Sequence, residues 1–146
     1  MSEIKVEAQG LEELQRDFRS LARKIEPKEL KPILRKEAQR FAALLLPRTP
    51  LGPTGNLRKG VKAWTPPITA RHPDAMARAG VRYRIAPHVH LVEYGTKERY
   101  NKRGAYRGVM PARHFIMSLG DSQMPGILRR IIDAVNKVIA REWNGT

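Results

Sequence analysis

Two histidines and a carboxylate fall within six residues of the sequence, and together they could bind a divalent cation. His88 and His90 would lie on the same face of a strand, Glu93 follows closely, and His114 is a fourth candidate ligand. A metal-dependent nuclease could use such a set. However, no further ligand stands at a diagnostic spacing, and the sequence has no His-Glu-x-x-His pattern. We therefore expect no metal site and no other cofactor.

Acid–base catalysis finds equally little support in the middle of the chain. Hydrolysis by paired carboxylates needs two acids whose surroundings separate their pKa values. The acids between residues 47 and 120 are Asp74, Glu93 and Glu98. We expect Glu93 to pair with a nearby cation rather than to transfer a proton. The candidate partners are Arg58, Lys59, Arg82, Arg84 and Arg113.

Two other kinds of catalytic site are excluded by spacing or by residue type. Thr54-Gly55-Asn56 lacks the Gly-x-x-x-x-Gly-Lys-Ser/Thr spacing of a phosphate-binding loop. The chain has no cysteine, which excludes a thiol nucleophile, a thiolate metal site and disulfides, and which fits assembly in a reducing cytoplasm. The residue types and spacings therefore give little support for a catalytic site.

Residues 95–113, here called the basic arm, are too polar to form part of a core. They contain six cations, one acid and two tyrosines, for a net charge of +5. This mixture suits single-stranded nucleic acid, through phosphate contacts and base stacking, and it suits protein interfaces equally well. Nucleic-acid binding and a protein interface therefore both remain open. A third alternative is a solvated loop without a binding role. The candidate contact residues are Lys97, Arg99, Tyr100, Lys102, Arg103, Tyr106 and Arg107.

The whole chain of 146 residues carries 28 Lys and Arg against 14 Asp and Glu, a net charge of +14. Such a charge attracts anionic polymers over a long range without selecting one of them. The length fits one domain, residues 1–146, and the longest apolar run, residues 41–47, is far too short to cross a membrane. We expect a soluble, single-domain protein with no cleavable signal and no membrane partner.

The hydrophobic pattern predicts a largely helical N-terminal third. Residues 3–8 alternate polar and apolar and predict a short strand that ends at Gly10. Apolar residues at spacings of three and four predict one amphipathic helix from Leu11 to about residue 26 and a second from Pro27 to about Leu46. Residues 47–56, with three prolines and two glycines, predict a connector.

The remainder of the chain predicts a small sheet and one more helix. Residues 57–65 and 76–84 alternate imperfectly around a Pro-rich turn, which predicts a hairpin or meander, and residues 88–94 fit a third strand or a helical turn. After a break at Gly120-Asp121, an apolar stripe over residues 127–143 predicts a C-terminal helix. The predicted fold is α+β: N-terminal helices and a long C-terminal helix packed on one face of a small, mostly antiparallel sheet, with a long basic loop.

Three short motifs follow one another between the predicted helices. They read Thr54-Gly55-Asn56-Leu57-Arg58, then Val92-Glu93-Tyr94-Gly95-Thr96, then Pro111-Ala112-Arg113-His114-Phe115. In this order the chain resembles the tail-completion or neck proteins of long-tailed phages, the gp-ten-like phage morphogenesis proteins, and is similar to minor tail protein Z of lambda-type phages. The resemblance covers nearly the whole chain. It departs from the family pattern at His88-Val89, where the family has Tyr-Ala, and at His114, where it has proline.

The second and third motifs flank the basic arm and suggest how it is attached. Gly95 can adopt a positive φ, and Thr96 can bond its own backbone, so the arm would leave the body at a fixed corner. Phe115 would act as an apolar plug where the chain returns to the core. The motif residues either hold the fold or belong to an interface, and the sequence leaves both readings open.

The resemblance implies a non-enzymatic virion protein, assembled in the host cytoplasm, that completes the tail or joins it to the head as part of a neck ring around the DNA channel. Its partners would be copies of itself, with sixfold symmetry favoured, and neck or tail proteins such as the tail terminator or head-closure protein. Phosphate-only contact with the DNA is a further expectation. Composition alone leaves one alternative, a stand-alone basic nucleic-acid-binding protein.

A ring requires heterologous contacts, in which one patch of a subunit meets a different patch of the next. Loops as long as the basic arm are usually functional or disordered. We therefore expect the basic arm to be an assembly element that is partly disordered in the free protein and is ordered by a neighbouring subunit or neck partner.

Overall fold

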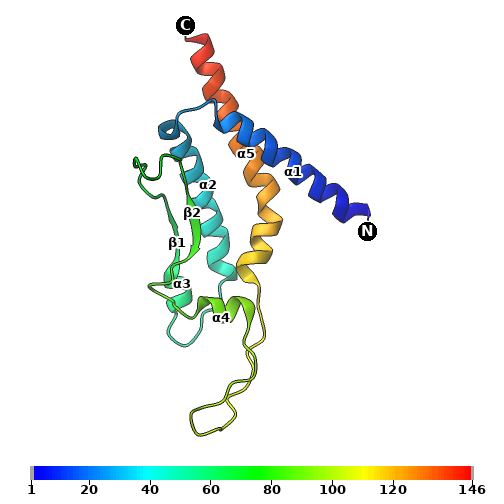
Figure 1. Cartoon of the computed structure of the whole chain (residues 1–146), viewed down its shortest axis with the longest axis vertical. Coiled ribbons are helices and arrows are strands. Elements are labelled where there is room, and N and C mark those ends of the chain that lie inside the picture. Colours follow the sequence, from blue (N-terminus) through cyan, green and yellow to red (C-terminus); the bar gives the residue numbers. More distant parts are fainter. Residues whose placement is uncertain (1, 146) are drawn as a thin grey trace.

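The computed structural model describes the backbone of residues 2–145 and the side chains of residues 10–145. Helix α5 runs along the length of the molecule, α2 lies beside it, the strands lie against α2, and α1 crosses α5 (Figure 1). The elements of the described chain are α1 (Ser2–Ala22), α2 (Pro27–Arg48), α3 (Asn56–Gly60), β1 (Val61–Trp64), β2 (Arg78–Val81), α4 (Val89–Tyr94) and α5 (Phe115–Asn144). The α+β class predicted from the sequence is confirmed.

The two strands form an antiparallel pair whose register runs from Val61 opposite Val81 to Trp64 opposite Arg78. Helix α2 packs against both strands. The guanidinium of Arg82 lies 4.7 Å from the centre of the Trp64 ring and covers it. The sheet is therefore a short ribbon supported on one side by α2.

The apolar side chains gather in two clusters, one at each end of the α2–α5 pair. The first lies where α2, α5, α3, α4 and the ribbon meet, and its buried members are Leu45, Leu57, Ala86, Val92, Phe115 and Leu119. The second lies among α1, α2 and α5, and its buried members are Ile25, Leu30, Ile131 and Val135. Each cluster uses residues three and four apart on a helix, the spacing that puts side chains on one face.

Residues 3–8 are helical, so the predicted N-terminal strand is wrong, and the helix predicted to start at Leu11 starts at Ser2. The alternation was short, and Glu, Lys and Ala favour a helix when no strand is available for pairing. This helix ends at Ala22, earlier than predicted, whereas α2 matches its predicted bounds within two residues.

Two of the predicted strands are shorter than expected, and the third is a helix. Residues 57–60 form most of α3, which buries Leu57, and only 61–64 and 78–81 pair as strands. Residues 89–94 form α4, because a helical turn buries Val92 and Glu93 together at the start of α5. The helical alternative for residues 88–94 is the correct one.

Helix α5 continues through Gly120-Asp121, so the predicted break is wrong. It also contains Pro125, which has no backbone N–H to donate to the preceding turn. Leu119 is fully buried on one side of this segment and Leu128 is buried on the other. Packing at both ends therefore keeps the helix in one piece against the local preference of its residues.

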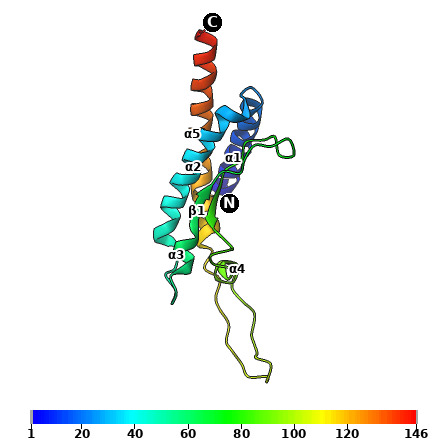
Figure 2. The ribbon, with the colours of Figure 1, turned by 90° about the vertical axis from the view of Figure 1, so that its left-hand side faces the viewer.

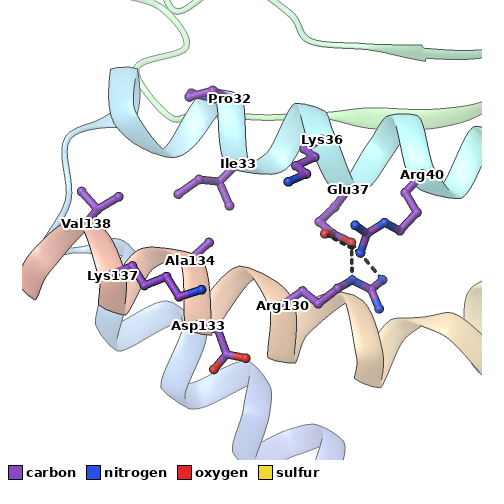
Figure 3. Close-up of a pocket in the computed structure, with 10 residues that line it drawn as sticks. All are labelled: Pro32, Ile33, Lys36, Glu37, Arg40, Arg130, Asp133, Ala134, Lys137 and Val138. Atoms are coloured by element: carbon purple, nitrogen blue, oxygen red, sulfur yellow. Dashed lines mark hydrogen bonds and ion pairs between the residues drawn. The ribbon is translucent and has the colours of Figure 1, made fainter.

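A buried carboxylate joins α2 to α5. Both guanidinium contacts of Arg130 to Glu37 Oε2 measure 2.9 Å, and Arg40 approaches Oε1 at 3.4 Å. These side chains line a groove of about 550 Å³ between the helices (Figure 3). The Glu37 side chain is only 8% exposed, so removal of a cation would leave it poorly compensated.

We expect Arg130→Met to lower the free energy of unfolding by about 2 kcal/mol, because it leaves Glu37 with Arg40 as its remaining ion-pair partner. Arg129→Met, on the exposed face of the same helix turn, is the matched control and should change it by less than about 0.5 kcal/mol. Urea unfolding followed by circular dichroism measures both. Equal losses in the two variants would contradict a special role for the Glu37–Arg130 pair.

Glu29 of α2 lies against Glu142 near the end of α5. A hydrogen bond between the two carboxyl groups, followed by desolvation and mutual repulsion, raises the pKa of Glu29 above its ordinary value of 4.5. The folded state therefore binds a proton at a pH where the unfolded state does not. This pair opposes folding at neutral pH and ceases to do so as the pH falls through the raised pKa.

Glu29→Gln should consequently raise the melting temperature at pH 7, and the gain should shrink as the pH approaches 4. Glu98→Gln, an exposed acid far from this pair, should show no such pH-dependent gain. Thermal unfolding between pH 4 and 8 gives the comparison. A gain for Glu29→Gln that is constant over this range would show that repulsion between the carboxylates is not its cause.

Candidate assembly interface

The basic arm projects beyond the body of the molecule, at the end opposite to the C-terminus. Figures 1 and 2 show it as a long loop that leaves α4, extends into solvent and returns to the start of α5; its two legs overlap in Figure 1 and are seen apart in Figure 2. In neither view does it touch another element along most of its length. Its conformation therefore depends on its root and on contacts within the arm.

The root of the arm is a joint between α4 and the first turn of α5. The amides of Ile116 and Met117 donate to the two carboxylate oxygens of Glu93 at 3.1 and 2.8 Å. The residue before α5, His114, has a φ of 45° and no capping bond from its own side chain. Glu93, which is only 4% exposed, takes the capping role and places a negative charge at the positive end of the helix dipole.

Backbone bonds complete this joint. The amide of Arg113 donates to the carbonyl of Val92 at 3.1 Å, and that of His114 donates to the carbonyl of Glu93 at 3.0 Å. Phe115, the first residue of α5, is buried in the cluster that contains Val92. The expectation that Phe115 anchors the returning chain is confirmed.

Glu93 was expected to pair with an arginine or lysine, and this expectation is wrong. Among residues 10–145, both ion pairs involve Glu37. Backbone amides satisfy the Glu93 carboxylate because α4 places it beside the first turn of α5. The N–H groups of a first turn have no partner within their own helix.

Gly95 has a φ of 75°, as expected. The surrounding backbone also leaves no room for a side chain at this position. A Cβ atom would lie 2.7 Å from the backbone nitrogen of Ala112 and 2.8 Å from the carbonyl oxygen of Met110.

Thr96 forms two hydrogen bonds with Met110: its amide donates to the Met110 carbonyl, and its hydroxyl accepts from the Met110 amide, both at 2.9 Å. Thr96 was expected to bond its own backbone, so this detail is corrected.

Further out, the basic arm is a two-stranded ribbon with few bonds. The amide of Arg107 donates to the carbonyl of Arg99, and that of Arg99 donates to Gly108. The rings of Tyr100 and Tyr106 meet edge to face, with 5.6 Å between their centres. At the tip, the side-chain oxygen of Asn101 accepts from two backbone amides. The Asn-x-x-Gly sequence at 101–104 carried this turn signal, which the prediction did not use.

Every predicted contact residue of the basic arm is exposed. Tyr100 and Tyr106 are each 58% exposed, and Val109 is 52% exposed. The cations Lys97, Arg99, Lys102, Arg103, Arg107 and Arg113 are exposed as well, and none forms an ion pair within residues 10–145. The structure thus brings the candidates together on one projecting ribbon with exposed charged and aromatic side chains.

The first motif, residues 54–58, serves the fold. Gly55 has a φ of 67° and starts α3, which directs Leu57 into the core. The Nε atom of Arg58 donates to the carbonyl of Thr49 at 2.8 Å, just beyond the end of α2. The amide of Asn56 contacts the Thr54 hydroxyl at 3.4 Å. These residues turn the chain after α2 and fix it there.

The histidines and the glutamate that were weighed as metal ligands do not converge in the described structure. His88 and His90 are exposed, and because residues 89–94 are helical they do not share a strand face. His114 packs edge to face with Tyr94, and Glu93 is occupied by amides. The side chains of residues 10–145 contain no group of three potential ligands placed to hold a metal ion.

Within the described chain, no helix combines the length and apolarity needed to cross a membrane.

An apolar groove was missed by the sequence patterns. It measures about 400 Å³ and opens among α1, α2, α5 and residues 75–79. Met76 and Met124, at its edge, are 42% and 39% exposed. The hydrophobic periodicity placed residues that line the groove, such as Phe18 and Phe41, on buried faces. Periodicity does not indicate whether neighbouring elements cover such a face completely.

Glu93→Ala should lower the free energy of unfolding by about 2 kcal/mol, because it leaves two partly buried amides of α5 without their acceptor and removes a negative charge from the start of the helix. Glu93→Gln keeps one acceptor and should cost about half as much. Asp121→Ala, an exposed acid further along α5, is the control and should cost less than about 0.5 kcal/mol. Chemical denaturation measures all three, and a Glu93→Ala loss no larger than that of Asp121→Ala would refute the capping role.

Comparison with known proteins agrees with this architecture. The model of the HK97 gp10-like family, bacteriophage tail components, matches residues 12–95, from α1 through α4 to the root of the basic arm. No curated protein and no solved structure matches the chain significantly. The family match covers more than half of the chain and confirms the family resemblance; the third motif, residues 111–115, lies outside the matched range. The chain belongs to the HK97 gp10-like family of bacteriophage tail components.

Proposed function

We propose that this phage tail component is a structural, non-enzymatic protein that completes the tail end or joins tail to head as a subunit of a ring around the DNA channel. The observation that carries the proposal is the basic arm. It has a rigid root, an exposed tip and no supporting contact from the body, an arrangement suited to contact with a neighbouring molecule.

The exposed area of the chain also favours assembly. A compact monomer of 16.6 kDa is expected to expose about 7,600 Å², whereas this chain exposes 10,880 Å². A standard interface takes about 800 Å² from each partner, so the excess could supply several interfaces. The apolar groove near Met76 and Met124 is a further surface of the kind that partners cover.

The proposed partners follow from a ring at the neck. They are copies of the same chain, with sixfold symmetry favoured because tails have that symmetry, and neighbouring neck or tail proteins such as the tail terminator or head-closure protein. The virion is the proposed site of action, after assembly in the host cytoplasm. Heterologous contacts between unlike patches would close the ring.

Contact with DNA is a second candidate role, favoured by the unpaired cations of the basic arm. Phosphate contacts in a channel would be independent of sequence and strongly dependent on salt. The edge-to-face packing of Tyr100 on Tyr106 occupies these rings with each other, which favours phosphate contact over base stacking.

An arm-shortened variant tests the proposal. Replacement of residues 100–107 by Asn-Gly keeps the root and closes the ribbon with a tight turn. We expect wild type to grow with concentration into one discrete oligomer without DNA, and the variant to stay monomeric with a melting temperature within a few degrees of wild type. Light scattering across a concentration series and circular dichroism measure the two properties.

Full assembly of the shortened variant would contradict a role for the arm. A wild-type monomer that binds DNA tightly, with affinity falling steeply as salt rises, would favour the stand-alone nucleic-acid-binding protein instead.

A further inference from the structure

Charge is distributed unequally among the long helices. Helix α1 contains five acids and three cations, a net charge of −2, whereas α2 carries +4 and α5 carries +1. The chain as a whole carries +14, so α1 is an acidic element on a strongly basic protein. Five of the 14 acids therefore lie within 21 residues.

The acids of α1 whose side chains are described face solvent. Glu12, Glu13 and Asp17 are exposed and form no ion pair within residues 10–145. Glu13 and Asp17 are four residues apart, so two like charges occupy the same helix face, an arrangement that costs stability until a cation approaches. Leu14 and Phe18 are partly buried on the adjacent face of the helix, where Phe18 packs in the cluster that α1 shares with α2 and α5.

The basic arm presents the complementary charge elsewhere on the molecule. The arm extends from the root beside α4, whereas α1 crosses α5 and its N-terminal end points away from the body (Figure 1). The two remain apart in the perpendicular view (Figure 2). In this structure the arm therefore does not lie on α1 of the same chain.

We propose that the basic arm of one subunit docks on the acidic face of α1 in a second copy, around Glu13 and Asp17. The contact joins two unlike patches, so each subunit offers one arm and one acidic face, and repetition closes a ring or extends a filament. This inference rests on the proposed self-assembly and adds the pair of surfaces that meet. Complementary charges here would set the partner and the register, with Tyr100 and Tyr106 supplying apolar area.

Charge reversal on either side tests the contact in the full-length protein. One variant combines Arg103→Glu and Arg107→Glu, the second combines Glu13→Lys and Asp17→Lys, and the third carries all four changes. All four positions are exposed, so the fold should persist, as circular dichroism will show. Asp74→Lys with Asp121→Lys reverses two exposed acids elsewhere and is the control.

Sedimentation velocity over a concentration series should show association weakened at least about tenfold by either reversal and largely restored by the fourfold swap, with the control like wild type. Oligomers that form equally well in both reversal variants would overturn this contact and leave the proposed ring intact. Arm reversal that abolishes DNA binding while self-association is unchanged would assign the arm to DNA and overturn the contact as well.

Disulfide trapping gives a second readout, even when association is weak. The chain contains no cysteine, so single cysteines report on single contacts. Ala105→Cys at the arm tip and Ser20→Cys, one turn after Asp17, are both exposed. Mixed and oxidised, the two variants should form a linked heterodimer, whereas Ser20→Cys with Ala70→Cys, in the exposed β1–β2 connection, should not. Equal yields from the two mixtures, or no product from either, would overturn the proposal.

Discussion

The capping of α5 by Glu93 is the interaction on which the rest of the molecule depends. One buried carboxylate from α4 satisfies two amides of the first turn of α5, and backbone bonds from Arg113 and His114 secure the same joint. His114 has a φ of 45° and offers no cap of its own, so Glu93 supplies the acceptors for the first turn of α5. This joint fixes Phe115 in the core and brings both ends of the basic arm to one point.

A rigid root beneath a weakly bonded ribbon has a physical consequence. The arm buries almost nothing, so its own bonds must offset the conformational entropy of about fifteen ordered residues, at roughly 1–2 kcal/mol each for the backbone alone. A partner surface would supply the missing contacts, and the fixed root would reduce the freedom lost on docking. The separation of acidic α1 from the basic arm gives two unlike surfaces on one subunit.

Residues with a clear apolar period were predicted well. The stripes of α2 and the second half of α5, the antiparallel ribbon and the α+β class all follow from patterns that burial enforces. The errors lie where tertiary contacts override local preference. Residues 3–8 lack a partner strand, and Leu119 and Leu128 hold α5 together across Gly120 and Pro125.

The motif residues were found, and their roles were only partly foreseen. Gly95 and Phe115 act as expected, because a positive φ and an aromatic side chain at a helix start are local signals. The partner of Glu93 was not predictable, because it depends on a contact between helices α4 and α5 that the sequence of neither one specifies. The contact residues of the basic arm stay a prediction, since the single chain shows their exposure and not what they touch.

Amide hydrogen exchange, measured in dilute monomer and in the assembled oligomer, tests most directly the claim that assembly orders the basic arm. The amides of Ile116 and Met117 should be protected in both states, whereas those of Arg99, Asn101 and Arg107 should exchange rapidly in the monomer and become protected on assembly. Arm amides equally protected in monomer and oligomer, or exposed in both, would contradict the account.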